Sequence, residues 1–175
     1  MIKHQDQRVG VFVDVQNMYH SGKNLYNANV NFANILEEAV GGRKLIRAIA
    51  YVIKSQVVEE EQFFDILNRQ GFEVKMKDLQ VFLGGAKKGD WDVGMSVDTI
   101  KIADRIDSVV LVTGDGDFVP LVTFLRENKG CMVEVMAFSQ SASSKLIEVA
   151  DDFIDLSKDP NKYLLHKKKR KSKKK

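Results

Sequence analysis

The sequence of 175 residues has a single cysteine, Cys131, and no long apolar run. One cysteine excludes an internal disulfide and a zinc site made of several cysteines, and it favours a reducing, intracellular compartment. We therefore expect a cytoplasmic protein. The apolar runs fall far short of the about 18 residues that a membrane-spanning helix needs, so no membrane partner is expected. The N-terminal segment does not resemble a signal peptide, because its short apolar stretch ends at Asp14 without a small-residue cleavage site.

The C-terminus lacks acidic residues and is rich in basic ones. The last ten residues, HKKKRKSKKK, contain eight Lys and Arg residues. Removing these eight from the total of 27 leaves 19 basic residues against 24 acidic ones, so the body of the chain carries a net charge of about −5. We predict one domain over residues 1–160 and a basic, disordered tail over residues 161–175.

The sequence leaves three interpretations of this tail open. It is a solvated extension that only keeps the protein soluble, or an arm that binds polyphosphate, since clustered Lys and Arg side chains release counterions from nucleic acid. If the source is eukaryotic, the same run is also typical of a nuclear-import signal, which would place the protein in the nucleus. RNA is the polyphosphate that the motifs described below favour.

Apolar runs and amphipathic segments alternate along the chain. Continuous apolar runs predict buried strands at residues 8–15, 44–53 and 72–77, and in the segments SVVLVTG and CMVEVMAF. Helical periodicity predicts helices between them, as in WDVGMSVDTIKIADRI. LQVFL (79–83) is either a short strand or a loop, and DFIDL is a candidate edge strand.

This alternation predicts an α/β fold, a three-layer sandwich with a central, mostly parallel sheet. Strands that are apolar throughout, rather than at every second residue, are typical of a parallel sheet covered on both faces. Right-handed crossovers then wind the helices over both faces. In such sheets the functional groups gather beyond the carboxyl ends of the strands, where the strand order reverses.

Four aspartates occupy positions that would bring them to such a point. Asp14 ends the strand VGVFV, and Asp115 follows SVVLVTG in the segment VTGDGDF. Asp117 is two residues further on, and Asp92 opens the helix after the loop GGAKKGD. Each also has a structural interpretation: Asp14 and Asp117 as helix caps, Asp115 as a turn residue, and Asp92 as a first-turn charge that favours the helix dipole. A carboxylate at the end of a buried strand is costly without a partner, which favours a site.

Polar and basic residues near these acids are further candidates. Asn17 is either a helix cap or a donor beside the site, and Lys87 and Lys88 either contact phosphate or belong to a solvated loop. The histidines show no spacing typical of a metal site or a catalytic triad, and no serine lies in a nucleophile-elbow motif.

Three motifs in order carry a resemblance to a known family. VGVFVDVQNMY, KKGDWDVGMSVDTI and VVLVTGDGDFVPLV together resemble the NYN domain family of PIN-like ribonucleases, in its LabA-like branch, over roughly residues 8–150. The resemblance implies a PIN-like fold with strand order 3-2-1-4-5 and metal-dependent RNA cleavage by an acidic cluster. By motif match, Asp14, Asp92, Asp115 and Asp117 take the acidic positions and Asn17 the asparagine of the first motif. Asp98 also matches an acid of the family, but it lies on largely another face of its helix than Asp92, and we expect it to be a surface or salt-bridged acid.

The expected function is a metal-dependent ribonuclease, an endonuclease acting on single-stranded RNA. Clustered carboxylates repel one another unless a cation lies among them, and oxygen ligands suit Mg²⁺ or Mn²⁺. The alternative is a catalytically weak module on the same scaffold that binds RNA or protein. A phosphatase of the haloacid-dehalogenase type is excluded, because Asp14 is followed by Val15 and Gln16 rather than by the second aspartate of its D-x-D motif. The sequence leaves open whether the chain is a monomer or a homodimer.

Overall fold

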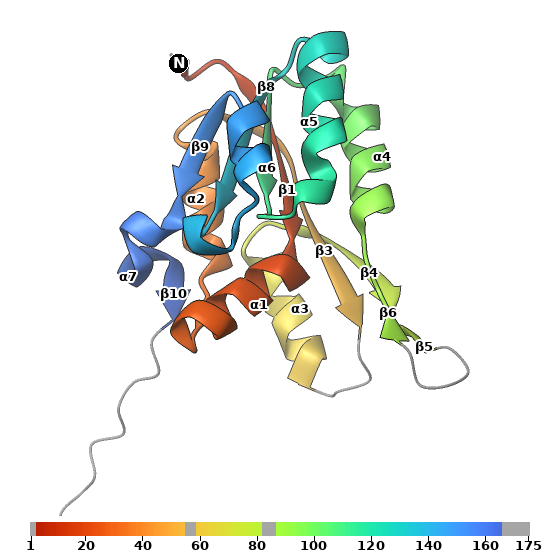
Figure 1. The fold of residues 1–175 in the computed structure, drawn as a ribbon, viewed down its shortest axis with the longest axis vertical. Coiled ribbons are helices and arrows are strands. Elements are labelled where there is room, and N and C mark those ends of the chain that lie inside the picture. Colours follow the sequence, from red (N-terminus) through yellow and green to blue (C-terminus); the bar gives the residue numbers. More distant parts are fainter. Residues whose placement is uncertain (1–2, 55–58, 82–86, 166–175) are drawn as a thin grey trace, which may run out of the picture.

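The computed structural model describes residues 3–54, 59–81 and 87–165. The run HKKKRKSKKK (166–175) lies outside the described residues, so its predicted disorder stays a prediction. Within the described part, the chain forms an α/β sandwich around one main sheet (Figure 1).

The main sheet is entirely parallel. Its strands are β1 (Arg8–Asp14), β3 (Lys44–Lys54), β4 (Glu73–Asp78), β7 (Ser108–Val112), β8 (Met132–Ala137) and β9 (Asp152–Asp155). They follow one another across the sheet as β4-β3-β1-β7-β8-β9. The first five of these have the predicted order 3-2-1-4-5, and the candidate edge strand is present as β9 beside β8. The sheet therefore differs from the expected one only by this added strand.

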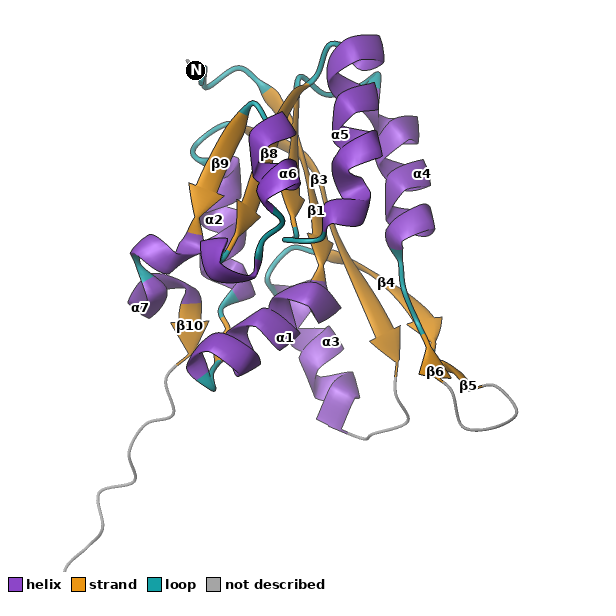
Figure 2. Ribbon diagram, viewed as in Figure 1, coloured by secondary structure: helices purple, strands orange, loops and turns teal. Residues whose placement is uncertain are grey.

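Helices cover both faces of the sheet (Figure 2). They are α1 (Val15–Tyr26), α2 (Phe32–Val40), α3 (Glu59–Arg69), α4 (Asp92–Ala103), α5 (Val119–Phe124), α6 (Ser144–Val149) and α7 (Pro160–Tyr163). A 3₁₀ turn at Gly116–Phe118 leads into α5, and a π turn at Leu125–Lys129 continues it. The short strands are β2 (Asn29–Val30), β5 (Gln80–Val81), β6 (Lys87–Lys88) and β10 (Leu164–Leu165).

The two faces of the sheet form two separate cores. On one face, Val11 of β1 packs in a cluster with residues of α1, α2 and α3. On the other, Phe12 packs with residues of α4, α5 and α6. Successive residues of a strand point to opposite faces, so a strand with a core on each side must be apolar at every position. This is why the strands read as continuous apolar runs.

The connection after β1 determines where a site can form. From β1 the chain builds β3 and β4 on one side, and it then returns to place β7 on the other side of β1. Val13 of β1 is the register partner of Val112 of β7, so the carboxyl ends of these two strands lie side by side. This is the point where strand order reverses, and ligands of open α/β sheets bind there.

The described chain remains folded beyond the predicted domain boundary at residue 160. Helix α7 starts at Pro160, and β10 pairs antiparallel with β2 through Leu164 and Val30. Tyr163 and Leu164 are buried in the core that α1 and α2 share. Residues 161–165, predicted from the sequence to belong to the tail, therefore pack on the body because two of their large apolar side chains, Tyr163 and Leu164, are buried. Within the described part of the chain, no helix has the length and apolar character needed to cross a membrane.

Candidate functional site

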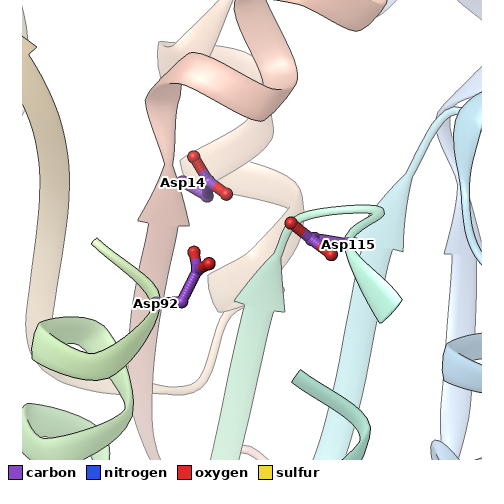
Figure 3. Close-up of side chains that lie close together, drawn as sticks. All are labelled: Asp14, Asp92 and Asp115. Atoms are coloured by element: carbon purple, nitrogen blue, oxygen red, sulfur yellow. The ribbon is translucent and has the colours of Figure 1, made fainter. Parts of the chain in front are cut away.

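Three of the four predicted aspartates meet at the reversal point. Asp14 is the last residue of β1, Asp115 lies in the loop after the neighbouring strand β7, and Asp92 is the first residue of α4. One carboxylate oxygen of each lies within 4.8 Å of one from each of the other two. Figure 3 shows the three side chains arriving from these separate segments and facing a common space. Residues far apart in the sequence are thus brought to one acidic centre.

Asp14 both caps a helix and belongs to the acidic centre. Its Oδ1 accepts a hydrogen bond from the Asn17 amide at 3.0 Å, which caps α1, and its Oδ2 accepts one from the Thr113 hydroxyl at 3.3 Å. Burial raises the pKa of the Asp14 carboxyl, and the charge of Asp115 adds to this rise. The capping interpretation from the sequence is correct, and it coexists with the place of Asp14 in the cluster.

The loop that carries Asp115 is held by hydrogen bonds from two sides. The Gly114 amide donates to Asn17 Oδ1 at 3.0 Å, and the Gly114 carbonyl accepts from the Ser143 amide at 2.8 Å. A Cβ at Gly114 would lie 3.0 Å from Ala142 Cα, so a side chain at this position would displace the loop. Asp115 Oδ1 in turn accepts from the Asp117 amide at 2.9 Å. Gly114, the first glycine of the GDGDF motif, thus permits the close approach of the Ala142 backbone that holds the loop of Asp115 in place.

Asp92 is the acid whose ionisation is most disfavoured. Its pKa is raised to about 6, chiefly by burial, and further by the negative charges of Asp115 and Asp14. No hydrogen bond to the Asp92 side chain occurs among the described residues, and no Lys, Arg or His there forms an ion pair with it. A cation between the three acids would reverse both unfavourable effects.

The other predicted site residues lie around this centre. Asp117 is exposed, in the 3₁₀ turn before α5, and it is not one of the three clustered acids, so its place as a ligand stays a prediction. Asn17 lines the pocket, although its Oδ1 is taken up by the Gly114 amide. Lys87 and Lys88 form β6, and their side chains lie outside the described part of the structure.

Asp98 is salt-bridged, as expected, and stands apart from the centre. Its Oδ2 accepts hydrogen bonds from the Tyr51 hydroxyl at 3.1 Å and from Lys75 Nζ at 2.6 Å. Burial raises the pKa of the Tyr51 phenol, and the charge of Asp98 adds to this rise. The phenol therefore stays protonated, and its O–H donates a hydrogen bond to Asp98. The residue stabilises the sheet edge at β4.

A pocket of about 200 Å³ opens beside the acidic centre. Its walls come from the acids, from the start of α1, from the end of β3 and from the loop before α4. The residues are Asp14, Gln16, Asn17, His20, Tyr51, Ile53, Gly89, Asp90, Trp91, Asp92 and Asp115. No sequence pattern pointed to Gln16, Tyr51, Ile53 or Trp91 as site residues. The available signal was position, since Gln16 directly follows the first acidic motif and Trp91 directly precedes Asp92.

A parallel α/β sheet with an acidic centre at its reversal point is consistent with a PIN-like fold. The NYN domain model matches residues 8–157 of this chain. The chain belongs to the NYN domain family.

Two individual proteins extend this relationship. The low amplitude and bright protein LabA of Synechococcus elongatus is 25% identical over 162 residues, which cover 86% of this chain and 84% of LabA. A crystal structure of a protein of unknown function from Vibrio parahaemolyticus superimposes with a TM-score of 0.85 at 34% identity, covering 94% of this chain and 100% of that one. The sequence similarity to LabA covers 86% of this chain, and the structural similarity to the Vibrio protein covers 94% of it.

Proposed function

We propose that this protein is a metal-dependent ribonuclease that cleaves single-stranded RNA as an endonuclease. The observation that carries the proposal is the convergence of Asp14, Asp92 and Asp115, with oxygens within 4.8 Å of one another. Stability does not account for this arrangement, because burial and mutual repulsion raise the pKa values of Asp14 and Asp92. An arrangement that is costly to the fold is expected where function requires it.

The donor set suits a hard divalent cation. The three side chains offer only oxygen atoms, which Mg²⁺ and Mn²⁺ prefer, and a soft nitrogen or sulfur donor is absent from this group of three. When bound there, such an ion polarises a phosphoryl oxygen and lowers the pKa of a water molecule. Asp14 and Asp115 are held by hydrogen bonds from fixed backbone segments, so they would position the ion. Asp92 would ligate it or orient the attacking water, and Asp117 would act at a second position or through water.

Basic segments would supply the attraction for RNA that the acidic body lacks. Strand β6 ends at Lys88, immediately before Gly89, which lines the pocket. Strand β6, which consists of Lys87 and Lys88, is thus adjacent to the site, and the run 166–175 adds eight further cationic side chains. Lys and Arg side chains near phosphates contribute sequence-independent affinity.

The replacement Asp115→Asn tests the proposal. Asparagine keeps the shape of the side chain and an acceptor for the Asp117 amide, but it removes the charge that would hold the ion. We expect cleavage of a labelled single-stranded RNA pool in Mn²⁺ to fall by about 10²-fold or more, with an unchanged circular dichroism spectrum. The matched control is Asp65→Asn, which makes the same change on the exposed face of α3 and should cleave like the wild type.

Two outcomes would contradict the proposal. Full activity in a folded Asp115→Asn protein would remove the acidic centre from the reaction. Binding of RNA by the wild type without any turnover in Mg²⁺ or Mn²⁺ would favour the alternative, a non-catalytic binding module on the same scaffold.

A further inference from the structure

One wall of the pocket beside the acids is aromatic and apolar. It is formed by Tyr51 and Ile53 at the end of β3 and by Trp91, which directly precedes Asp92. The acids do not need such a wall in order to hold a cation. Trp91 of this wall directly precedes Asp92, the first residue of α4, and both residues line the pocket. A group that lies against Trp91 in the pocket therefore lies next to the acidic centre.

Several contacts hold the indole of Trp91 in one orientation. Its Nε1–H donates a hydrogen bond to the Val52 carbonyl at 2.9 Å. The Tyr51 ring lies with its centroid at 5.3 Å and at an angle of 59°. A Cβ on Gly94 would lie 2.6 Å from the indole Cε3, so the glycine leaves the space that the ring occupies. A ring fixed in advance loses little conformational freedom when a second ring stacks on it.

The surroundings of the indole are those of a site for a flat, polar-edged group attached to an anion. Lys77 Nζ lies over the indole ring, 5.9 Å from its centroid, and donates to the Asp90 carbonyl at 3.1 Å, so one face of the ring has a cation above it. Helix α1 contributes Gln16 and His20 to the lining of the same pocket. The Gln16 amide, which offers both donors and an acceptor, has no hydrogen-bond partner within the described part of the chain.

The size of the pocket limits what can enter. About 200 Å³ is smaller than the roughly 300–1,000 Å³ of pockets that enclose a drug-sized ligand. It is suited to one planar ring system, with the rest of the ligand outside. Every nucleobase has a π-face that stacks on an aromatic side chain and an edge with hydrogen-bonding groups.

We propose that this pocket binds one unpaired nucleobase of the RNA, stacked on Trp91, beside the phosphate that is cleaved. This inference rests on the proposed function, since it assumes that the acidic centre acts on an RNA phosphodiester. A base in a duplex is stacked on both faces and paired along its Watson–Crick edge, so it cannot enter the pocket. The pocket thus restricts cleavage to unpaired nucleotides, and Gln16 contacts the edge of the bound base.

The only tryptophan of the chain provides a direct readout. The probe is a short oligoadenylate, titrated in Mn²⁺ against the full-length Asp115→Asn protein so that the RNA stays intact. Its control is an oligomer of the same length and charge with abasic ribose units. We expect oligoadenylate to change the fluorescence of Trp91, and the abasic oligomer to bind more weakly and leave the fluorescence unchanged.

Substitutions give an independent measurement in the same background. We expect Trp91→Ala to weaken oligoadenylate binding about 5- to 150-fold, the loss typical of one base–aromatic stack, and not to alter binding of the abasic oligomer. Trp91→Phe, which keeps a ring, should lie between Trp91→Ala and the parent. The control Phe124→Ala removes an exposed aromatic side chain on α5, 38% accessible, and should bind like the parent.

The outcomes separate the two proposals. Equal affinity for oligoadenylate and the abasic oligomer, with unchanged Trp91 fluorescence, would overturn the base pocket, while cleavage by the wild type would leave the ribonuclease intact. Absence of RNA binding together with absence of cleavage would overturn both. If Trp91→Ala does not fold, the fluorescence titration of the parent alone still decides the question.

Discussion

Asp92 differs from the other two acids of the centre in what holds its carboxylate. Asp14 accepts hydrogen bonds from Asn17 and Thr113, and Asp115 accepts one from the Asp117 amide. Asp92 has no such donor among the described residues, and its pKa is raised to about 6 by burial and by its two acidic neighbours. Its charge is therefore the least stabilised of the three when no metal is bound.

The pH dependence of stability follows from this raised pKa. The pKa of Asp92 in the fold, about 6, lies above the roughly 3.9 of an unfolded aspartate, so between these values the folded chain binds more protons. In chelator, the stability of the protein should fall as the pH rises from about 4 to about 6. Asp92→Asn should show a weaker fall and melt above the wild type at pH 7.5, but not at pH 4. Thermal melts at both pH values test this, and equal melting temperatures at pH 7.5 would contradict it.

Added metal should reverse the order of the melting temperatures, so that the wild type becomes more stable than a variant that lacks one of the acids. Wild type should gain stability in excess Mn²⁺, by about 2.7 kcal/mol when free metal is 100-fold above its dissociation constant. Asp115→Asn should melt higher than wild type in chelator, because repulsion is relieved, and should lose most of the gain with Mn²⁺. Asp65→Asn should behave as wild type in both conditions. If the acids served only as caps, Asp115→Asn would melt lower in chelator, by about 1 kcal/mol, and Mn²⁺ would shift neither protein.

At the scale of elements, helix α1 and the loop after β7 are joined through one side chain. The side-chain Oδ1 of Asn17, on α1, accepts a hydrogen bond from the Gly114 backbone amide. The backbone N–H of Asn17 donates to Asp14 Oδ1, which caps α1. The same residue therefore relates the strand end that carries Asp14 to the loop that carries Asp115. A change in this contact should alter the spacing of the acids without touching any of them.

We expect Asn17→Ala to lower both stability and activity. It leaves the buried Gly114 amide without its acceptor, which costs about 1–3 kcal/mol, and it frees the loop of Asp115. The control is Asn24→Ala, an exposed position on the same helix with the same gain in helix propensity, which should not be destabilised. Urea unfolding and the RNA cleavage rate measure the two effects, and a stability equal to that of Asn24→Ala would refute the bridging role.

The sequence allowed the elements and the three acids Asp14, Asp92 and Asp115 to be placed, but not the walls of the pocket. Continuous apolar runs predict strands, and a parallel sheet brings the residues after β1 and β7 to one edge, hence Asp14 and Asp115. The sequence could not show that Asp115 joins the acidic cluster and Asp117 does not, because this depends on the direction of the turn at Gly116–Phe118. Tyr51 could not be found, because its place beside Asp14 follows from the β1–β3 register, which tertiary packing determines.

At the scale of the whole molecule, acids at the two ends of the parallel sheet differ in whether a cationic side chain pairs with them. Near the amino ends of the strands, Glu134 is fully buried, and it accepts hydrogen bonds from Arg43 at 2.5 Å and from Ser108 at 2.6 Å. Lys3 forms a further ion pair with it. At the carboxyl ends, the three acids have no cationic side chain paired with them among the described residues. The structural acid is neutralised by the protein, whereas neutralisation of the acidic centre would require the cation of the proposed function.

The basic run should determine how RNA binding responds to salt. Deleting residues 167–175 removes eight positive charges from a protein whose body carries about −5. If all eight contacted phosphates, the slope of log K against log salt would lose up to about 5.6, and partial engagement makes about 2–4 the expected loss. Binding isotherms at several salt concentrations measure the slope. An unchanged slope after truncation would show that the run does not contact RNA.

The unequal hydrogen bonding of the three acids also bears on how the site would decay by mutation. A descendant that no longer needed catalysis would still gain from Asp14 as the cap of α1 and from Asp115 as the acceptor of the Asp117 amide. Selection for folding alone would therefore retain these two acids and favour replacement of Asp92, which makes the fold less stable. Under the proposed function, a relative that keeps the first and third motifs but carries a neutral residue at the position of Asp92 would be one that has lost the activity. An aspartate at that position would indicate continuing selection for it.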